Sequence, residues 1–173
     1  MTDLETPVSW RAAEITVSDS RDRDGFQDRS GDIIVERLAA LPASLVSRTA
    51  VTDSVDEIRS AVVEGVKAAD IVVLTGGTGL GPRDVTPQTL LPLLDYEVPG
   101  FAEVMRHDGL TSTPHAMLSR QVAGVIGRTL ILSLPGNPRA VGECLDAVWA
   151  ALPHALTLLH GDTRHSDEAP ANR

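Results

Sequence analysis

The segment 70–87 constrains the fold of this chain more than any other part of the sequence. It begins with DIVVL at 70–74, an apolar, β-branched run that predicts a strand buried on both faces of a sheet. Four glycines then follow within six residues, at positions 76, 77, 79 and 81. Glycine permits positive φ and leaves no Cβ to obstruct a ligand, so the backbone N–H groups of such a loop can converge on an anion. Thr86 and Pro87 then predict the N-cap and the first turn of a helix.

The rest of the chain alternates strands with helices. We predict further strands at 13–18, 45–51 and 129–134, helices starting at 30 and 54 and spanning 87–94, 100–109 and 138–159, and an irregular stretch at 111–127. This alternation predicts an α/β domain with three layers, α/β/α, around a mainly parallel sheet. In such sheets ligands bind beyond the carboxyl ends of the strands. Four segments are expected there: 18–20, 52–53, 75–84 and 133–138.

The helix that starts at 54 carries a recognisable N-terminal signal. The sequence SVDE at 54–57 predicts a capping box. The spacing of Val55, Ile58, Val62 and Val66 places these side chains on one face, which we expect to be buried.

Length, charge and cysteine content limit the class of protein. The 173 residues fit one domain, and we expect an N-terminal segment at 1–10, the domain at 11–160 and a flexible tail at 161–173. A net charge of −9 without a basic run argues against nucleic acid as a partner. The single cysteine, Cys144, excludes an intramolecular disulfide and agrees with a reducing cytoplasm. No signal peptide is visible, and no run approaches the ~18 apolar residues of a membrane span, so we expect a soluble cytoplasmic protein.

The glycine loop differs from the common phosphate loops. Pro82 stands where a Walker loop requires lysine and also where a dinucleotide fingerprint requires its third glycine. Two interpretations of the loop remain. The glycines serve either a tight turn by geometry alone or a ligand, and the hydroxyl groups of Thr75 and Thr78 favour the ligand.

Several charged residues are expected to lie at or near the carboxyl ends of the predicted strands. Asp84 and Asp53 are candidate ligands of Mg²⁺ or proton acceptors beside a phosphate. Each also has a simpler interpretation, because Asp84 favours a nearby helix dipole and Asp53 suits a turn. Ser18, Asp19 and Arg83 are candidates for contacts with phosphate.

The turn SLPGNP at 133–138 shows the same order of features as the glycine loop. A strand leads into a glycine turn, Asn137 is the expected N-cap and Pro138 occupies the first helical position. The N-terminus of the following helix suits an anion or the polar edge of a heterocycle. A capped structural helix explains the same residues equally well.

Taken together, these motifs resemble one family. TGGTG at 75–79, RDVTP at 83–87, SLPGNP at 133–138, SDS at 18–20 and the position of Asp53 are similar to those of molybdopterin adenylyltransferases of the MogA/MoaB type. The resemblance implies transfer of an adenylyl group from Mg-ATP to the terminal phosphate of molybdopterin, which gives adenylylated molybdopterin and pyrophosphate on the route to molybdenum cofactor. It also implies a homotrimer that hands its product to a molybdenum-insertion enzyme.

The resemblance also implies roles for individual residues. Asp53 and Asp84 correspond to the carboxylates required for catalysis, with Mg²⁺ as the cofactor and ATP as co-substrate. Ser18, Asp19 and Arg83 would then lie near the nucleotide. The implied molybdopterin-binding residues come from both glycine turns: Thr75, Gly76, Gly77, Thr78, Gly79, Ser133, Pro135, Gly136 and Asn137.

Two departures from the family pattern support an alternative function. Gln88 stands where many relatives carry an acidic residue, and the second turn reads GNP, which also occurs in the related domain of the molybdenum-insertion enzymes. The alternative is a molybdopterin-binding carrier or assembly module of the MoaB type with little or no adenylyl transfer.

Overall fold

A computed structural model describes residues 9–21 and 24–161 of the chain. Most of the expected N-terminal segment 1–10 and of the expected tail 161–173 therefore lies outside the described residues. The described part contains a six-stranded sheet in the order β2-β1-β3-β6-β5-β4. The strands are β1 (Trp10–Val17), β2 (Ala43–Val51), β3 (Ile71–Thr75), β4 (Tyr96–Glu97), β5 (Ala123–Ile126) and β6 (Thr129–Leu134). The pairs β1–β2, β1–β3 and β3–β6 are parallel, which confirms the predicted α/β class with a mainly parallel sheet.

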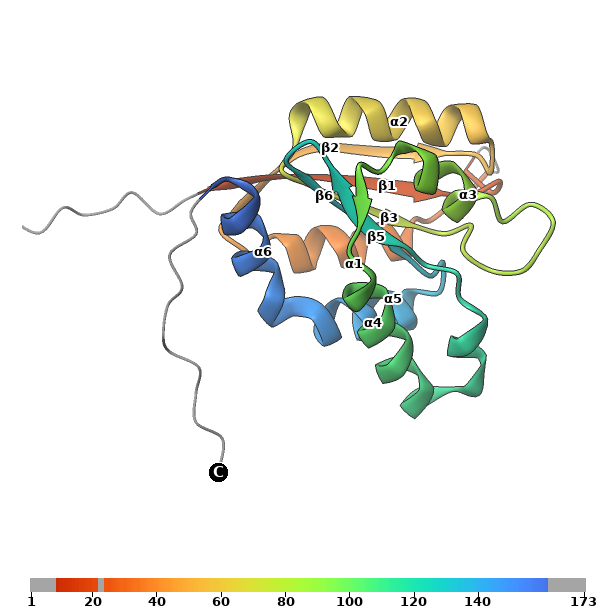
Figure 1. Ribbon diagram of the computed structural model, residues 1–173. Helices are drawn as coiled ribbons and strands as arrows, with labels where there is room; N and C mark the ends of the chain where they lie inside the picture. The colour runs from red at the N-terminus through yellow and green to blue at the C-terminus, as the bar shows by residue number, and fades with distance from the viewer. Residues whose placement is uncertain (1–8, 22–23, 162–173) are drawn as a thin grey trace, which may run out of the picture.

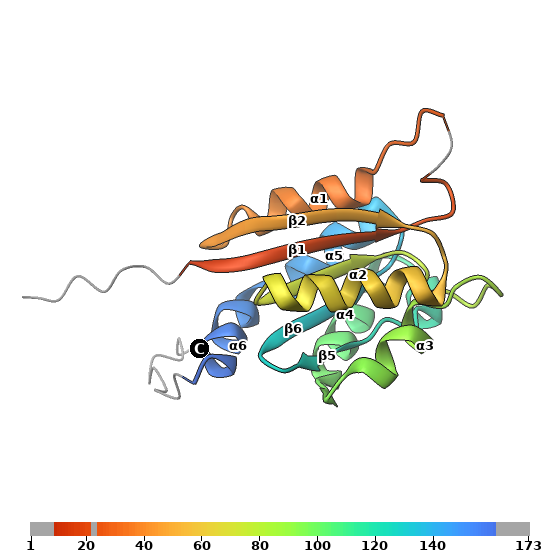
Figure 2. The same cartoon turned by 90° about the horizontal axis from the view of Figure 1, so that it is seen from above.

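Helices cover both faces of the sheet, as the two perpendicular views show (Figures 1 and 2). They are α1 (Arg29–Leu38), α2 (Val55–Ala68), α3 (Thr86–Leu90), α4 (Pro99–Ser112), α5 (Pro138–Val148) and α6 (Leu152–Leu159), with 3₁₀ turns at Leu91–Leu93, Pro114–Leu118 and Trp149–Ala151. Side chains of α1, α4, α5 and α6 enter one apolar cluster, and those of α2 and α3 enter the other. None of the helices in the described part has the length and apolar character needed to span a membrane.

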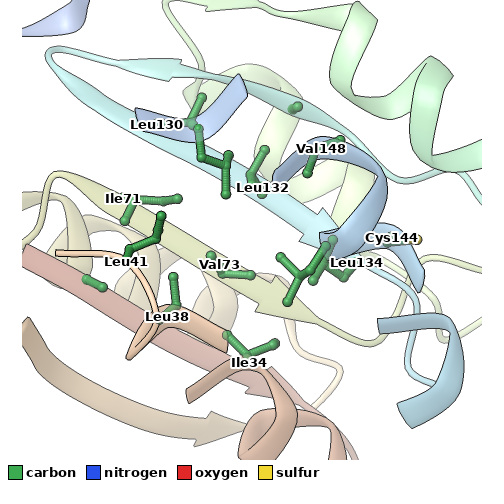
Figure 3. Packing of buried hydrophobic residues seen from close by; sticks show 14 of the residues in the cluster. Ile34, Leu38, Leu41, Ile71, Val73, Leu130, Leu132, Leu134, Cys144 and Val148 are labelled. Atoms are coloured by element: carbon green, nitrogen blue, oxygen red, sulfur yellow. The ribbon is translucent and has the colours of Figure 1, made fainter. Parts of the chain in front are cut away.

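The central strands explain why the apolar runs of the sequence are continuous. Ile71 and Val73 of β3 pack into the cluster on the α1 side, whereas Val72 and Leu74 pack into the cluster on the α2 side. All four side chains are fully buried. Figure 3 shows the α1-side cluster around β3 and β6. Because each such side chain contributes about 1.5–3 kcal/mol on burial, both layers of helices are held firmly against the strands that carry the functional loops.

The structure corrects the prediction of an irregular stretch at 111–127. This stretch contains the end of α4, a 3₁₀ turn and strand β5, which pairs antiparallel with β6. Gly127 has φ of +61° and closes the connection between the two strands. The four residues of β5 are too few for a periodic signal, and the strand depends on β6 for its hydrogen bonds.

The predicted capping box of α2 is wrong. Ser54 is the N-cap residue but makes no side-chain cap hydrogen bond, and Glu57 Oε2 instead accepts from the Thr52 N–H at 3.1 Å. Val55 is 39% exposed, so it does not belong to the buried face. Ile58 is fully buried as predicted.

Candidate functional site

Loops that follow β1, β2, β3 and β6 meet at the carboxyl end of the sheet (Figure 2). They enclose a hollow of about 430 Å³, which we call the carboxylate hollow. It is lined by residues from all four segments predicted from the strand ends, among them Ser18, Asp19, Asp53, Thr75, Gly76, Gly77, Asp84 and Gly136. The four segments that were predicted to lie at the carboxyl ends of the strands therefore do meet around one hollow.

The fold itself requires two of the loop glycines. Gly76 and Gly77 have φ of +98° and +64°. A Cβ on Gly76 would lie 2.2 Å from the backbone oxygen of Val17, and one on Gly77 would lie 2.4 Å from Thr86 Oγ1. Chain geometry thus accounts for both glycines, and their presence alone does not indicate a ligand.

The threonine hydroxyls of this region connect neighbouring loops. Thr75 Oγ1 donates to the carbonyl of Pro135 at 2.7 Å and so joins the two glycine turns. Thr86 was predicted as an N-cap, and this prediction is wrong, because α3 begins at Thr86 itself and its N-cap is Val85. The buried Thr86 hydroxyl instead donates to the carbonyl of Gly76 at 2.9 Å.

Two other candidate hydroxyls point into the protein. Ser133 is fully buried. Its Oγ accepts from the Val122 N–H at 2.6 Å and lies 2.9 Å from the Val122 carbonyl, to which it donates. Thr78 is 3% exposed and its hydroxyl lies 3.5 Å from Ser119 Oγ. The Ser133 hydroxyl therefore links β6 to Val122, immediately before β5.

The second glycine turn caps α5 as predicted. Asn137 Oδ1 accepts from the N–H groups of Arg139 at 2.9 Å and Ala140 at 3.3 Å. Ser30 Oγ, on the first turn of α1, donates to the carbonyl of Gly136 at 2.8 Å. The turn separates two hollows, because Gly136 lines the carboxylate hollow while Pro135 and Asn137 line a second one.

Three carboxylates, those of Asp19, Asp53 and Asp84, lie at the edge of the carboxylate hollow. The Asp19 N–H donates to Asp53 Oδ2 at 3.0 Å, and the Asp53 N–H donates to Asp19 Oδ1 at 3.1 Å. Arg83 pairs with Asp19, and the Gly81 N–H donates to Asp84 Oδ2 at 2.8 Å. Burial raises the pKa of Asp53, and the charges of Asp19 and Asp84 raise it further, against the backbone hydrogen bond and Arg83.

These carboxylates fit a metal ion only if another molecule supplies further ligands. The described residues contain no group of three or more side chains placed to hold a metal. Asp53 Oδ1 and Asp84 Oδ2 both abut the loop, 3.0 and 2.9 Å from the positions that a Cβ would take on Gly77 and Gly79. Mg²⁺ commonly binds one or two carboxylates together with substrate phosphates. The pair Asp53 and Asp84 suits a magnesium ion that arrives with a phosphate ligand.

The sequence predicts no role for Arg120 in the site, although Leu118, Ser119 and Arg120 also fit the family that the chain resembles. Its guanidinium donates to the carbonyl of Gly79 through Nε at 2.8 Å and to that of Asp84 through Nη2 at 2.7 Å. Its own N–H donates to the carbonyl of Thr78 at 2.8 Å. Arg120 thereby fixes the backbone of the glycine loop and the position of Asp84.

The second hollow, about 440 Å³, lies between α4 and α5, and we call it the α4–α5 hollow. Gln121 is 3% exposed within its lining, and its Nε2 has no hydrogen-bond partner. Ser112 Oγ and Arg139 Nε both donate to Glu143 Oε1, at 2.9 and 2.8 Å. Burial raises the pKa of the Cys144 thiol to about 11, so this side chain is not a thiolate nucleophile.

Comparison with known proteins agrees with this architecture. The family described as a probable molybdopterin binding domain matches residues 13–154. The chain belongs to this family. A crystal structure of the molybdopterin biosynthesis enzyme MoaB from Thermus thermophilus is 46% identical, covers 88% of this chain and 97% of that one, and superposes with a TM-score of 0.82.

Curated proteins that are similar to the chain differ in length. A molybdopterin adenylyltransferase of Helicobacter pylori (strain J99) is 35% identical over 158 residues, which cover 89% of this chain and 90% of that protein. The molybdenum cofactor biosynthesis bifunctional protein of Synechococcus elongatus is 37% identical over 151 residues, 87% of this chain. The chain spans 47% of the length of that bifunctional protein.

Proposed function

We propose that this chain is a molybdopterin adenylyltransferase that uses Mg-ATP. The observation that carries the proposal is the pair Asp53 and Asp84 beside the glycine loop, in a hollow that one turn separates from a second hollow. Two neighbouring hollows suit a reaction that joins two substrates. The similarity to an adenylyltransferase over most of both chains supports the same choice.

In the proposed reaction, a terminal phosphate oxygen of molybdopterin attacks the α-phosphorus of ATP. A new P–O bond forms, the bond from the α-phosphorus to the bridging oxygen breaks, and pyrophosphate leaves. The attacking phosphate is already anionic, so the reaction needs positioning and charge neutralisation more than a general base. Mg²⁺, when bound, neutralises negative charge on the phosphates.

The residues of the chain divide these tasks. Asp53 and Asp84 would hold Mg²⁺, and Arg120 keeps Asp84 in place through the loop backbone. Asp19 orients Asp53 through the reciprocal backbone hydrogen bonds, while Arg83 balances the charge of Asp19. We place the triphosphate in the carboxylate hollow, near Ser18, Asp19 and Arg83.

We place molybdopterin across the turn that separates the hollows. Its phosphate would approach the glycine loop, and its pterin ring would enter the α4–α5 hollow. Among the nine candidate residues of the two glycine turns, four line the carboxylate hollow (Thr75, Gly76, Gly77 and Gly136) and two line the α4–α5 hollow (Pro135 and Asn137). Thr78, Gly79 and Ser133 lie outside the lining of both hollows. Gln121 lies in the lining of the α4–α5 hollow, and its buried Nε2 has no hydrogen-bond partner, so a small shift of this amide would supply a donor for the polar edge of a heterocycle.

Calorimetry tests the assignment of the carboxylate hollow. Mg-ATP should bind the chain, and omission of Mg²⁺ or the substitution Asp53→Asn should weaken binding strongly. Arg139→Ala is the matched control, because Arg139 lines the other hollow and should leave Mg-ATP affinity unchanged. A chain that binds molybdopterin but shows no magnesium-dependent ATP site would instead be the carrier suggested by Gln88, which is exposed on α3.

We further propose that the protein works in the cytoplasm as a homotrimer and passes adenylylated molybdopterin to a molybdenum-insertion enzyme. The family resemblance supports this assembly. Light scattering on the purified chain should give three times the subunit mass of 18.4 kDa. A monomeric mass at micromolar concentration would contradict the trimer.

A further inference from the structure

Glu14 lies in the middle of β1 and is fully buried between the sheet and α1. It has no part in the chemistry proposed above. Burial of a charged carboxylate is costly unless the charge is paired and hydrogen-bonded, and a carboxyl in this position often remains protonated. The contacts of Glu14 therefore decide whether its carboxyl group is protonated.

The contacts of Glu14 require a proton that the hydroxyl beside it cannot supply. Thr16 Oγ1 lies 2.7 Å from Glu14 Oε1 and 2.8 Å from Asp28 Oδ2. A hydroxyl carries one proton, so it cannot donate to two carboxylates at once. Both contacts are hydrogen bonds only if one of the two carboxyl groups is protonated and donates to Thr16 Oγ1.

The partners of the two acids identify the protonated one. Asp28 accepts from the Gly31 N–H at 2.9 Å and pairs with Arg48 Nη2 at 3.0 Å. Glu14 Oε2 has no hydrogen-bond partner and lies 3.5 Å from Arg48 Nε. The charged groups that face Glu14 are Asp28 before α1, Asp32 on α1 and Arg48 on β2. Arg48 is thus the shared cation of all three carboxyl groups. The proton is therefore assigned to Glu14, the fully buried one.

The resulting chain of hydrogen bonds reaches the carboxylate hollow. Asp28 is the N-cap of α1, and Thr16, Asp28 and Ser30 all line the hollow. Ser30 Oγ also donates to the carbonyl of Gly136 in the second glycine turn. A proton on Glu14 lets Thr16 donate to Asp28, and this bond helps fix the first turn of α1 against the hollow.

We propose that Glu14 is a positioning residue whose proton, passed on through Thr16, orients Asp28 and the first turn of α1 at the carboxylate hollow. Loss of the proton turns the Thr16 hydroxyl toward Glu14 and ends its donation to Asp28. The same step places a buried negative charge behind the hollow, which disfavours an anionic ligand there.

Glu14 is expected to lose its proton near neutral pH. Burial raises the pKa of Glu14 to about 7, with a further increase from Asp28 and Asp32 and opposition from the Thr16 hydrogen bond and Arg48. The proton is therefore bound below about pH 7 and lost above it.

NMR on the free protein tests the proposal without any substrate, so its outcome does not depend on the proposed function. Between pH 5.5 and 8.5, the ¹³C shift of the Glu14 carboxyl should titrate with a midpoint near 7, within about one unit. The Gly31 amide, which donates to Asp28, should shift with the same midpoint. In Glu14→Gln, a neutral variant of nearly equal size, the Gly31 transition should disappear.

Asp32→Asn is the matched control, because it removes a carboxylate paired with Arg48 but leaves the chain from Glu14 to Asp28 intact. The Gly31 transition should persist in this variant. Two results would overturn the proposal: a Glu14 carboxyl that is fully ionised at pH 5.5, or a Gly31 transition that persists in Glu14→Gln. If Mg-ATP binds, its affinity should fall with rising pH more steeply in wild type than in Glu14→Gln, because titration of the ligand is common to both.

Discussion

Replacement of Gly76 by alanine should destabilise the fold strongly, whether or not a ligand is present. Gly76 has φ of +98°, and its N–H donates to the carbonyl of Leu134 at 3.1 Å. A Cβ at this position would lie 2.2 Å from the backbone oxygen of Val17. Backbone atoms cannot rotate away as a flexible side chain can, so the ends of β1 and β3 would have to separate.

The magnitude follows from three contributions. A left-handed conformation costs an L-residue roughly 1–2 kcal/mol. Separation of the strand ends would weaken the bond to Leu134 and the bond from Thr86 Oγ1 to the Gly76 carbonyl, at about 1 kcal/mol each. The expected loss is therefore about 3–4 kcal/mol, a large part of the ~5–15 kcal/mol typical of a folded domain.

Two other glycines provide matched controls. Gly127 has φ of +61° but no atom within 4 Å of a built Cβ, so Gly127→Ala should cost only the conformational penalty, roughly 1–2 kcal/mol. Gly142 lies inside α5 with equally open space, and Gly142→Ala should stabilise by about 0.4–1 kcal/mol.

Urea unfolding followed by far-UV circular dichroism measures all three variants. We expect the order Gly142→Ala, wild type, Gly127→Ala, Gly76→Ala from most to least stable. If Gly76→Ala were no less stable than Gly127→Ala, the reasoning that chain geometry demands this glycine would be refuted.

Three further predictions concern single side chains. Asp84→Asn should lower turnover at least about tenfold while molybdopterin affinity, measured by calorimetry, stays largely intact; equal turnover would remove Asp84 from the mechanism. Arg120→Lys should lower the free energy of unfolding by about 1–3 kcal/mol and speed hydrogen exchange in the glycine loop, because one ammonium cannot reproduce the paired hydrogen bonds of the guanidinium. Unchanged hydrogen exchange would show that the hydrogen bonds of Arg120 do not fix the loop backbone. For Asp70, burial raises the pKa, but the hydrogen bonds and charge of Arg11 outweigh this and lower it overall. The stability lost in Asp70→Asn should therefore be present at neutral pH and shrink below about pH 4, and a loss of stability that grows as the pH falls below about 4 would contradict this prediction.

The parts of the fold that sequence predicts are those with a local cause. The runs that became β3 and β6 are apolar because both sheet faces are covered, and the Asn137 cap and Pro138 mark the start of α5 through contacts within a few residues. Because parallel strands end at one edge, the carboxylate hollow also follows from the order of the segments. Strand β5 was not predicted, because its four residues carry no clear pattern and its strand conformation depends on pairing with β6.

The parts that sequence did not predict depend on distant contacts. Arg120 reaches carbonyls of residues 36 and 41 positions earlier in the chain, and no pattern of residue types announces such a contact. Glu57 suits a capping box by spacing, but the Thr52 N–H takes its carboxylate. Glu14 interrupts an apolar strand, and only its contacts with Thr16 and Arg48 reveal its surroundings.

The most direct test of the proposed activity is molybdopterin-dependent release of pyrophosphate from Mg-ATP by the purified chain. The account predicts release that requires both molybdopterin and Mg²⁺ and that falls sharply in Asp53→Asn and Asp84→Asn. Absence of release above background, with molybdopterin shown to be intact and tightly bound, would contradict adenylyl transfer and leave the carrier function in its place.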